Sequence, residues 1–489
     1  MKIVIIENPR PLSIEHYNDV ANAPLSASLN SGYALAVARR AGWDVGYLDL
    51  SASHQSEQTM AGQIIAQGAD VILVHWVYSW GHEATVRAVL ARVKREQNVM
   101  IGAFGLFPTL SRSRLPEYAP QLDFIIVGEF EQTLDDLLRS RENGDRPMAV
   151  PGLAHRETTY AARDVIDDLT WLPVPDDVGA NCDYTTMNIA ASRGCFGECS
   201  FCFISGFYSC SRRRERSVSS LEAEIEARLQ RRRIDQLYFI DPTFIGHGAT
   251  QRDRVAAISG IARSAAIPFG FETRVDTVDK RLFNLLAKNG ASSVFLGIES
   301  GCDSVLRRIN KKTTTRQISR AVHCIQESGI PLTIGFIMFE PDSTMAELAE
   351  NYDFLEDLGL LSDHELTVNL LYHNQIVLYG SESWNRFEKA GRLLLDENLP
   401  FEAGYRFKHV AVARVCRTMR LMASGYFQGM ERLRGKGIRQ VDDAAINGVM
   451  KEAFRECIGI AENSSEQYYH HREELFLADL HSLLADSKG

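Results

Sequence analysis

Short apolar runs alternate with helical stretches along most of the chain, and this alternation limits the fold more than any other feature of the sequence. Strands separated by helices form βαβ units, which build a parallel sheet with helices on its faces. We expect the first strands at Lys2–Glu7, Val45–Leu50, Val71–Val74, Val99–Ala103 and Asp123–Val127, and the first helices at Gly32–Ala41, Met60–Gln67, His82–Arg95 and Glu131–Arg139. Residues 1–145 are therefore predicted to form a doubly wound α/β domain.

A second series of strands and helices follows a segment rich in turn formers and proline. Residues 146–180 are predicted as a linker, because proline punctuates Asp167–Pro175. The next strands are expected at 188–192, 236–240, 269–273, 293–298, 332–338 and 366–371, with helices at 221–232, 252–264, 280–289, 315–328 and 345–358. Six such units predict a full or partial α/β (TIM-like) barrel over residues 181–385, with its chemistry at the carboxyl ends of the strands. Residues 386–489 are expected to form a helical C-terminal region.

Composition narrows the class of protein. The chain has 489 residues, 45% apolar residues and a formal net charge of −10, so a nucleic-acid or anionic-membrane binder is not expected. We find no apolar run of 18 residues, and the N-terminus resembles a strand more than a signal peptide. Nine cysteines in so long a chain form no disulfide framework. A cytoplasmic protein is expected.

Three cysteines lie within eight residues, at the spacing Cys195-x3-Cys199-x2-Cys202. Thiolates are the ligands of iron–sulfur clusters, and three of them can hold three irons of a four-iron cluster. The fourth iron is then open to a substrate or cofactor. A structural zinc site commonly uses four ligands in paired units, and no second pair is found. Cys182 and Cys210 stay possible fourth ligands.

The cysteine loop resembles that of the radical S-adenosylmethionine (SAM) superfamily, in which an aromatic residue, here Phe201, precedes the third cysteine. The resemblance covers residues 165–350. It implies a [4Fe-4S] cluster on Cys195, Cys199 and Cys202 whose open iron chelates the amino and carboxylate groups of SAM. An electron donor such as flavodoxin or ferredoxin then drives cleavage to a 5′-deoxyadenosyl radical. The rival outside radical chemistry is an iron–sulfur or zinc-binding interaction module.

Further segments of the predicted barrel resemble the SAM site of that family, and four residues are assigned by this resemblance. Besides Phe201, it implies that Arg274 grips the SAM carboxylate, that Glu299 reaches the ribose or amino group, and that Phe336 lies near the adenine. An arginine suits a planar carboxylate because it presents two donors. A plain ion pair stays an alternative for Arg274, and helix capping or an ion pair stays an alternative for Glu299.

Substrate-handling residues are expected at the barrel mouth. Asp241, Glu272 and His373 are the catalytic candidates, since a reaction that expels hydroxide needs a general acid. The neighbouring acids Asp276, Glu340 and Asp342 suit the ammonium and hydroxyl groups of a small polar substrate. Helix capping is the alternative role for Asp241.

The first domain resembles the cobalamin-binding-like domain of one branch of the superfamily, in its Gly128–Glu131 segment and its Leu172–Pro175 linker. Many members of that branch are methyltransferases. Bulky residues follow the third and fourth strands here: Trp76, Tyr78, Trp80, Phe104 and Phe107. We expect them to fill the place of a corrin, so that cobalamin is possible but not favoured.

A subset of the branch works without cobalamin, including the radical dehydratase type of apramycin-type aminoglycoside (antibiotic) biosynthesis. The resemblance therefore favours a lyase that dehydrates an aminosugar. A cobalamin-dependent methyltransferase of natural-product biosynthesis is the alternative. His75 and His82 are expected to be loop or core histidines, the acids of Gly128–Glu131 to cap a helix, and Arg212–Arg216 to be a solvated loop.

Overall fold

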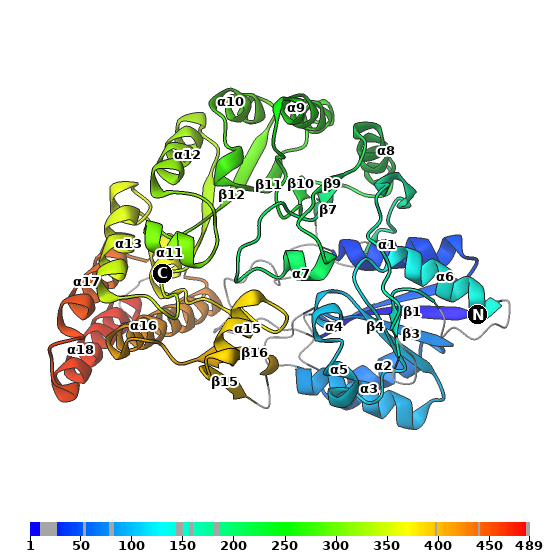
Figure 1. Ribbon diagram of the computed structural model, residues 1–489, viewed down its shortest axis with the longest axis horizontal. Helices are drawn as coiled ribbons and strands as arrows, with labels where there is room; N and C mark the ends of the chain where they lie inside the picture. The colour runs from blue at the N-terminus through cyan, green and yellow to red at the C-terminus, as the bar shows by residue number, and fades with distance from the viewer. Residues whose placement is uncertain are drawn as a thin grey trace.

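The structure is a computed structural model, and it describes residues 1–9, 27–51, 55–77, 83–142, 150–155, 160–178, 185–396, 399–438 and 441–485. It consists of an N-terminal α/β domain, a half-barrel and a C-terminal region that contacts both (Figure 1). Tyr78, Trp80, His82 and Cys182 lie outside the described residues, as do parts of the predicted linker.

The N-terminal domain is built on a six-stranded sheet of order β2-β1-β3-β4-β5-β6. The strands are β1 (Lys2–Glu7), β2 (Asp44–Asp49), β3 (Val71–His75), β4 (Met100–Phe104), β5 (Phe124–Ile126) and β6 (Leu153–Ala154), and only β6 is antiparallel. Helices α1 (Leu29–Arg40) and α6 (Glu131–Glu142) cover one face, and α2 (Glu57–Ile65) and α3 (Glu83–Glu96) cover the other. Short helices α4 (Leu106–Ser111) and α5 (Leu115–Tyr118) follow β4. The doubly wound prediction is confirmed.

The second domain is an open half-barrel of parallel strands in the order β13-β12-β11-β10-β7. Its strands are β7 (Thr186–Ile189), β10 (Gln236–Phe239), β11 (Phe269–Arg274), β12 (Ala291–Glu299) and β13 (Leu332–Phe336). The helices α8 (Val218–Leu229), α9 (Ala249–Ser264), α10 (Lys280–Lys288), α12 (Thr315–Ser328) and α13 (Met345–Asp357) form an outer arc around them (Figure 1). Residues alternate between the faces of a strand, so the outer core takes Phe269 and Phe271 while Glu272 and Arg274 face inward.

A sixth barrel strand is absent from the described residues, and the prediction at 366–371 is wrong. That segment forms helix α14 (His364–Tyr372), which Asp363 caps by accepting a hydrogen bond from the Leu366 N–H at 3.0 Å. A short apolar run fits a buried helix as well as a buried strand. One parallel bridge between Phe339 and Asn374 is all that continues the sheet beyond β13. The barrel is therefore partial.

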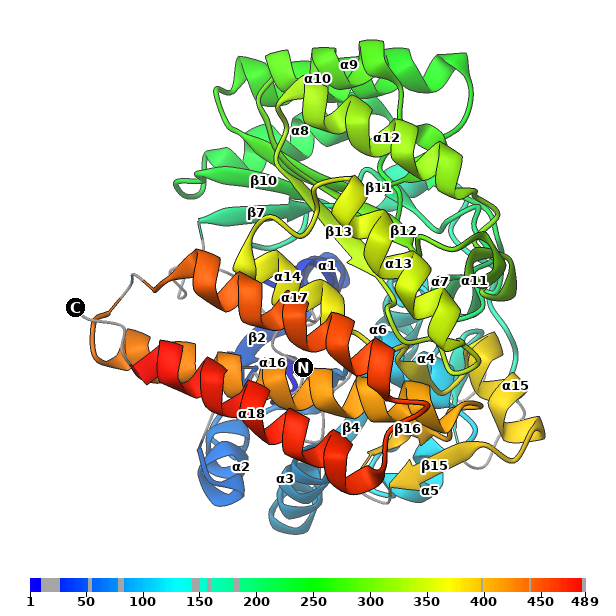
Figure 2. The ribbon, with the colours of Figure 1, turned by 90° about the vertical axis from the view of Figure 1, so that its left-hand side faces the viewer.

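The C-terminal region combines the expected helices with a small sheet that the sequence did not indicate. Helices α16 (Val410–Gly435), α17 (Asp443–Ile460) and α18 (Glu466–Ala485) pack side by side (Figure 2). Before them, β14 (Val377–Leu378), β15 (Leu393–Asp396) and β16 (Leu399–Tyr405) form an antiparallel sheet, with α15 (Glu382–Lys389) inserted. Phe401 of this sheet packs on Phe107 of the first domain, ring centroids 4.1 Å apart. Within the described part of the chain, every helix is too short or too polar to cross a membrane.

Candidate functional site

The cysteine loop leaves the first barrel strand and returns to it. The short strands β8 (Ser192–Arg193) and β9 (Arg214–Glu215) pair antiparallel at its base, and α7 (Ile204–Tyr208) lies within it. This pairing brings Cys195, Cys199 and Cys202 to the carboxyl ends of the barrel strands, where α/β barrels perform their chemistry.

A second loop holds the cysteine loop in place. The Ser200 N–H donates to the Ile309 carbonyl at 2.9 Å, and the Asn310 amide donates to the Glu198 carbonyl at 2.6 Å. Lys312 adds an ion pair to the Glu198 carboxylate at 2.6 Å. Asn310 and Lys312 both take left-handed backbone conformations, with φ of 54° and 58°. Residues 309–312 therefore hold the backbone on both sides of Cys199.

The surroundings of the three sulfurs fit an iron–sulfur cluster. The Gly197 N–H donates to Cys195 Sγ at 3.2 Å, and Arg274 Nη1 donates to Cys199 Sγ at 3.7 Å. In a four-iron cluster each thiolate binds a different iron, so the sulfurs need not converge on one ion. No three His, Cys, Asp or Glu side chains converge on a single ion within the described ranges. In the absence of metal, burial raises the pKa of Cys202 to about 12, and iron binding would displace that proton.

Arg274 lies at the end of β11 against this loop. Its guanidinium donates to Asp276 Oδ1 and to the Lys311 carbonyl, both at 3.1 Å, and it stands 5.3 Å from the Phe196 ring centroid. A Cβ on residue 197 would lie 2.5 Å from Arg274 Nη1, so this approach needs Gly197. The ion pair with Asp276 is thus present, and contact with the SAM carboxylate stays a prediction.

Glu299 ends β12 in a backbone conformation that side-chain-bearing residues rarely adopt. Its φ is +67°, and the strand register shifts between Gly297 and Glu299. Strain of this kind clusters at functional sites. Lys311 Nζ donates to Glu299 Oε1 at 2.8 Å, and a Cβ on residue 297 would lie 2.7 Å from the same oxygen. Lys311, 4% exposed, is a cation of the site that is not among the residues assigned from the sequence.

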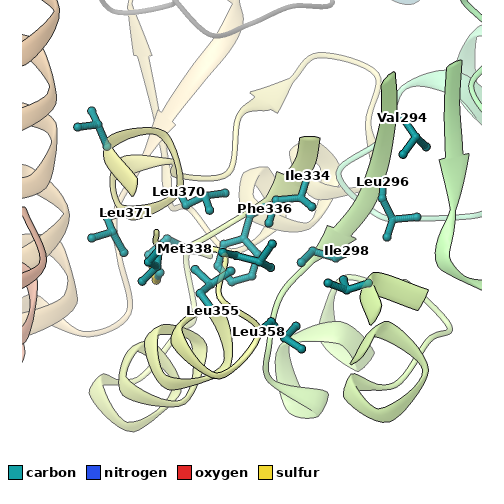
Figure 3. Close-up of a cluster of buried hydrophobic side chains, with 14 of the residues drawn as sticks. Val294, Leu296, Ile298, Ile334, Phe336, Met338, Leu355, Leu358, Leu370 and Leu371 are labelled. Carbon is teal, nitrogen blue, oxygen red and sulfur yellow. The ribbon is translucent and has the colours of Figure 1, made fainter. Parts of the chain in front are cut away.

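Phe201 and Phe336 differ in how close they come to this group. Phe201 is half-buried directly before the third cysteine and packs on a small cluster of Cys302, Val305 and Ile309. Phe336 is 3% exposed and lies in the outer hydrophobic core with Met338 and other side chains of β12, β13 and α13 (Figure 3). Its ring therefore points away from the inner face that carries Glu299. The predicted contact of Phe336 with adenine has no support in this arrangement.

The three catalytic candidates occupy different environments. Asp241 is fully buried and accepts hydrogen bonds from the Ala191 N–H at 2.9 Å and from the Ser192 hydroxyl. It therefore ties β10 to the chain just before the cysteine loop, and it caps no helix. Glu272 faces inward and accepts a hydrogen bond from Tyr238 Oη at 3.3 Å. Burial raises the pKa of Glu272 to about 7.

His373 ends α14 at the open side of the half-barrel. Its carbonyl accepts a hydrogen bond from the Phe339 N–H at 3.1 Å, and its half-buried ring lies 4.8 Å from that of Tyr372. Glu272 therefore lies on the inner face of the sheet, whereas His373 lies beside the missing sixth strand. The structure does not bring the three candidates together, and their catalytic roles stay predictions.

The neighbouring acids are mostly engaged elsewhere. Glu340 is completely buried between Arg308 and Arg386, with ion pairs of 2.7 Å to each. Asp342 pairs with Arg386 and with Arg392. These acids join the half-barrel to α15 and β15, so they are not presented to a substrate.

Buried ion pairs join the first domain to the cysteine loop. Arg193, two residues before Cys195, donates to Glu129 at 3.0 Å and to Glu131 at 3.1 Å, and Arg214 donates to Glu129 at 2.7 Å. The acids of the Gly128–Glu131 segment therefore bind the barrel, and Glu131 also stands in the first turn of α6, as the capping prediction expects. Arg214 is 5% exposed, so the solvated-loop prediction for its segment is wrong there.

The aromatic residues of the first domain lie inside its cores. Trp76 and Phe107 stack at 5.0 Å in the core beneath α2 and α3, while Phe104 packs on Phe130 at 4.5 Å in the core beneath α1 and α6. All three are at most 1% exposed. From the sequence we expect these side chains beyond the edge of the sheet, where a corrin would lie. In the structure they pack instead into the hydrophobic cores on the two faces of the sheet. These three side chains therefore do not occupy the edge of the sheet, and the argument from them against cobalamin loses its basis.

His75 lies at the end of β3, between these cores. Its Nδ1 lies 2.9 Å from Glu7 Oε1, and the ring is 4% exposed. This agrees with the core-histidine interpretation of His75.

Comparison with known proteins agrees with this geometry. Residues 189–355 match the radical SAM superfamily, and residues 27–138 match the B12 binding domain. These two matches confirm the resemblance to the radical SAM superfamily, and to its branch with an N-terminal domain of the B12-binding type.

Among its relatives is the hopanoid C-2 methylase of Rhodopseudomonas palustris (strain TIE-1), 25% identical over 308 residues, which cover 61% of this chain and 55% of that protein. Another is the 4′-phospho-dehydrooxetanocin synthase of Priestia megaterium, 27% identical over 310 residues, 56% of this chain and 41% of that one. The chain thus spans about half the length of these two relatives.

The fold is similar to that of the cobalamin-dependent SAM radical enzyme OxsB with aqua-cobalamin bound. The TM-score is 0.77 at 17% identity, over 100% of this chain and 77% of the other. At that identity the likeness shows the fold, and it confirms the α/β architecture with a helical C-terminal region.

Proposed function

We propose that this chain cleaves SAM reductively and directs the resulting radical chemistry to a small-molecule substrate. The observation that carries the proposal is the chain of contacts Cys199–Arg274–Lys311–Glu299 across the carboxyl ends of β11 and β12. A [4Fe-4S] cluster on Cys195, Cys199 and Cys202 would supply the electron that breaks the sulfonium of SAM.

Protein residues around the cluster would bind and orient SAM. Arg274 offers a carboxylate more than one donor, and its ion pair with Asp276 fixes its plane. Glu299 would accept hydrogen bonds from the amino or ribose groups, and its ion pair with Lys311 holds the carboxylate in place. The inner face of the half-barrel would hold the reacting atoms in near-attack geometry, away from water.

We also propose that the first domain holds cobalamin, which would supply a methyl-carrying cobalt. Support comes from the match to the B12 binding domain and from the likeness to a structure with aqua-cobalamin bound. Described residues at the carboxyl ends of β3, β4 and β5, among them Gly105 and Gly128, would form its seat. The reaction class is then methyl transfer, the class that the name of the hopanoid C-2 methylase gives for that relative.

Dehydration of an aminosugar without cobalamin is the second candidate, and the resemblance of the sequence to that dehydratase type supports it. In that reaction Glu272 would serve as the proton donor, since it is buried on the inner face with a raised pKa. Eight free cysteines among the described residues suit the reducing cytoplasm that we propose for the chain.

One experiment separates the two candidates. The anaerobically purified chain is reconstituted with iron and sulfide, and its corrin content is measured after incubation with hydroxocobalamin and gel filtration. Stoichiometric retention of the corrin supports the first candidate. The second candidate, dehydration, is supported if the chain retains no corrin and converts one of a series of tested aminosugars at the same rate with and without cobalamin.

A further inference from the structure

A groove of about 390 Å³ runs along helix α16 in the C-terminal region. Arg417, Arg420, Ser424 and Phe427 line it from one face of the helix, since they recur at three- and four-residue spacing. Tyr372 and Phe407 close it from outside the helix. The groove thus combines aromatic walls with two cationic heads.

The charge of the groove contrasts with that of the chain. The formal net charge is −10, yet the groove is lined by two arginines and by no carboxylate. Glu473 compensates Arg417 at 3.4 Å. Arg420 makes no hydrogen bond or ion pair with any residue in the described ranges. The guanidinium of Arg420 is therefore available to an incoming anion, and guanidinium groups bind phosphate and carboxylate through two parallel hydrogen bonds.

The groove begins where the half-barrel is open. Tyr372 is the last residue of α14, next to the Phe339–Asn374 bridge that continues the sheet beyond β13. Phe407 packs on Tyr405 at 5.1 Å, and Tyr405 Oη accepts a hydrogen bond from the Asn374 amide at 3.2 Å. A molecule in the groove would therefore extend from the open edge of the sheet.

We propose that this groove binds the anionic end of the substrate, a phosphate, phosphonate or carboxylate attached to an apolar group. The aromatic residues take the apolar part, and Arg420 grips the anion with Arg417 beside it. The proposal rests on the proposed function, because it names the class of substrate for the radical reaction proposed above. It opposes a purely cationic substrate such as an aminosugar, which two arginines would repel.

The test measures binding to the reconstituted full-length chain by isothermal titration calorimetry, with phenyl phosphate, benzoate and 2-deoxystreptamine as probes. We expect phenyl phosphate or benzoate to bind at least tenfold more tightly than the cationic 2-deoxystreptamine. Whichever of the two anions binds more tightly shows whether the groove prefers a phosphate or a carboxylate. Arg420→Gln should weaken binding of that anion at least tenfold. Arg432→Gln, on an exposed stretch of the same helix outside the groove, should leave it unchanged.

Tighter binding of 2-deoxystreptamine, or equal anion affinity of the Arg420→Gln and wild-type chains, would overturn the proposal. Cleavage of SAM by the wild-type chain without any probe is measured on the same preparation. If the wild-type chain binds the anion but does not cleave SAM, that result counts against the proposed function and not against the groove.

Discussion

Arg193 and Glu131 form an ion pair that is almost fully buried between the cysteine loop and the first domain, with side-chain exposures of 8% and 0%. Glu129 shares the same guanidinium at 3.0 Å. The pair joins the residue two positions before Cys195 to the start of α6. The first domain therefore helps to set the position of the cluster loop.

Glu131→Gln should destabilise the chain, because it leaves the buried Arg193 with one of its two charge partners. Breaking a buried ion pair by removing one partner costs about 3–5 kcal/mol, and the remaining Glu129 places the expected loss at the lower end. Urea unfolding followed by tryptophan fluorescence measures it. Glu117→Gln, at an exposed position of α5, is the control and should leave the midpoint unchanged. Equal midpoints for Glu131→Gln and wild type would mean that the domains do not depend on this contact.

Cys199→Ala should abolish the brown chromophore of the reconstituted chain, because three irons need three thiolates. Cys210→Ala is the matched control, since Cys210 is a half-buried free cysteine on the same loop. It should keep full iron and sulfide content. A parallel loss in both variants would point to a four-cysteine site with no open iron.

Arg274→Ala should weaken SAM binding by about 1.5–3 kcal/mol, the worth of a charge-assisted hydrogen-bonded contact. Titration of the reconstituted chain with SAM measures the loss. Because Arg274 also donates to Cys199, iron content is checked in the same sample. Arg281→Ala, at an exposed position of α10, is the control. Unchanged SAM affinity in the Arg274→Ala chain would mean that Arg274 does not bind the SAM carboxylate and serves the fold through its ion pair with Asp276.

Glu272 should make stability depend on pH. Burial raises its pKa from 4.5 to about 7, so the folded chain binds an extra proton between these values. The free energy of unfolding therefore falls as pH rises, and the contribution is lost above about pH 7. At 1.36 kcal/mol per pKa unit the total is about 3 kcal/mol. Urea unfolding from pH 5 to 8 should show this fall in the wild-type chain, and Glu272→Gln should lack it. If the free energy of unfolding of the two chains changes with pH in the same way, the Glu272 carboxyl is in contact with water and its pKa is not raised.

Local pattern predicts most of the fold and the centre of the site. The strand–helix alternation identifies both sheets, because each element buries an apolar face against its neighbours. The spacing of Cys195, Cys199 and Cys202 is enough by itself to identify the cluster loop.

The errors occur where a distant partner decides. Leu366–Leu371 is apolar enough for a strand, but the Asp363 cap and the C-terminal helices make it a helix. In the sequence, Arg214 and its neighbours resemble a solvated charged run. In the structure, Arg214 forms a buried ion pair with Glu129 of the Gly128–Glu131 segment. Trp76 follows β3 and Phe104 ends β4, so the sequence suggests side chains at the edge of the sheet. In the structure their rings pack into the cores on the two faces of the sheet. Apart from the Asp363 cap, these partners lie far away in sequence.

Reductive cleavage of SAM is the most direct test of the account. The anaerobically reconstituted chain is reduced with dithionite in the presence of SAM, and 5′-deoxyadenosine is quantified by mass spectrometry. We predict that 5′-deoxyadenosine forms with the wild-type and Cys210→Ala chains and is absent with Cys199→Ala. A wild-type chain that carries its full complement of iron and sulfide, is fully reduced, and yields no 5′-deoxyadenosine would contradict the central claim.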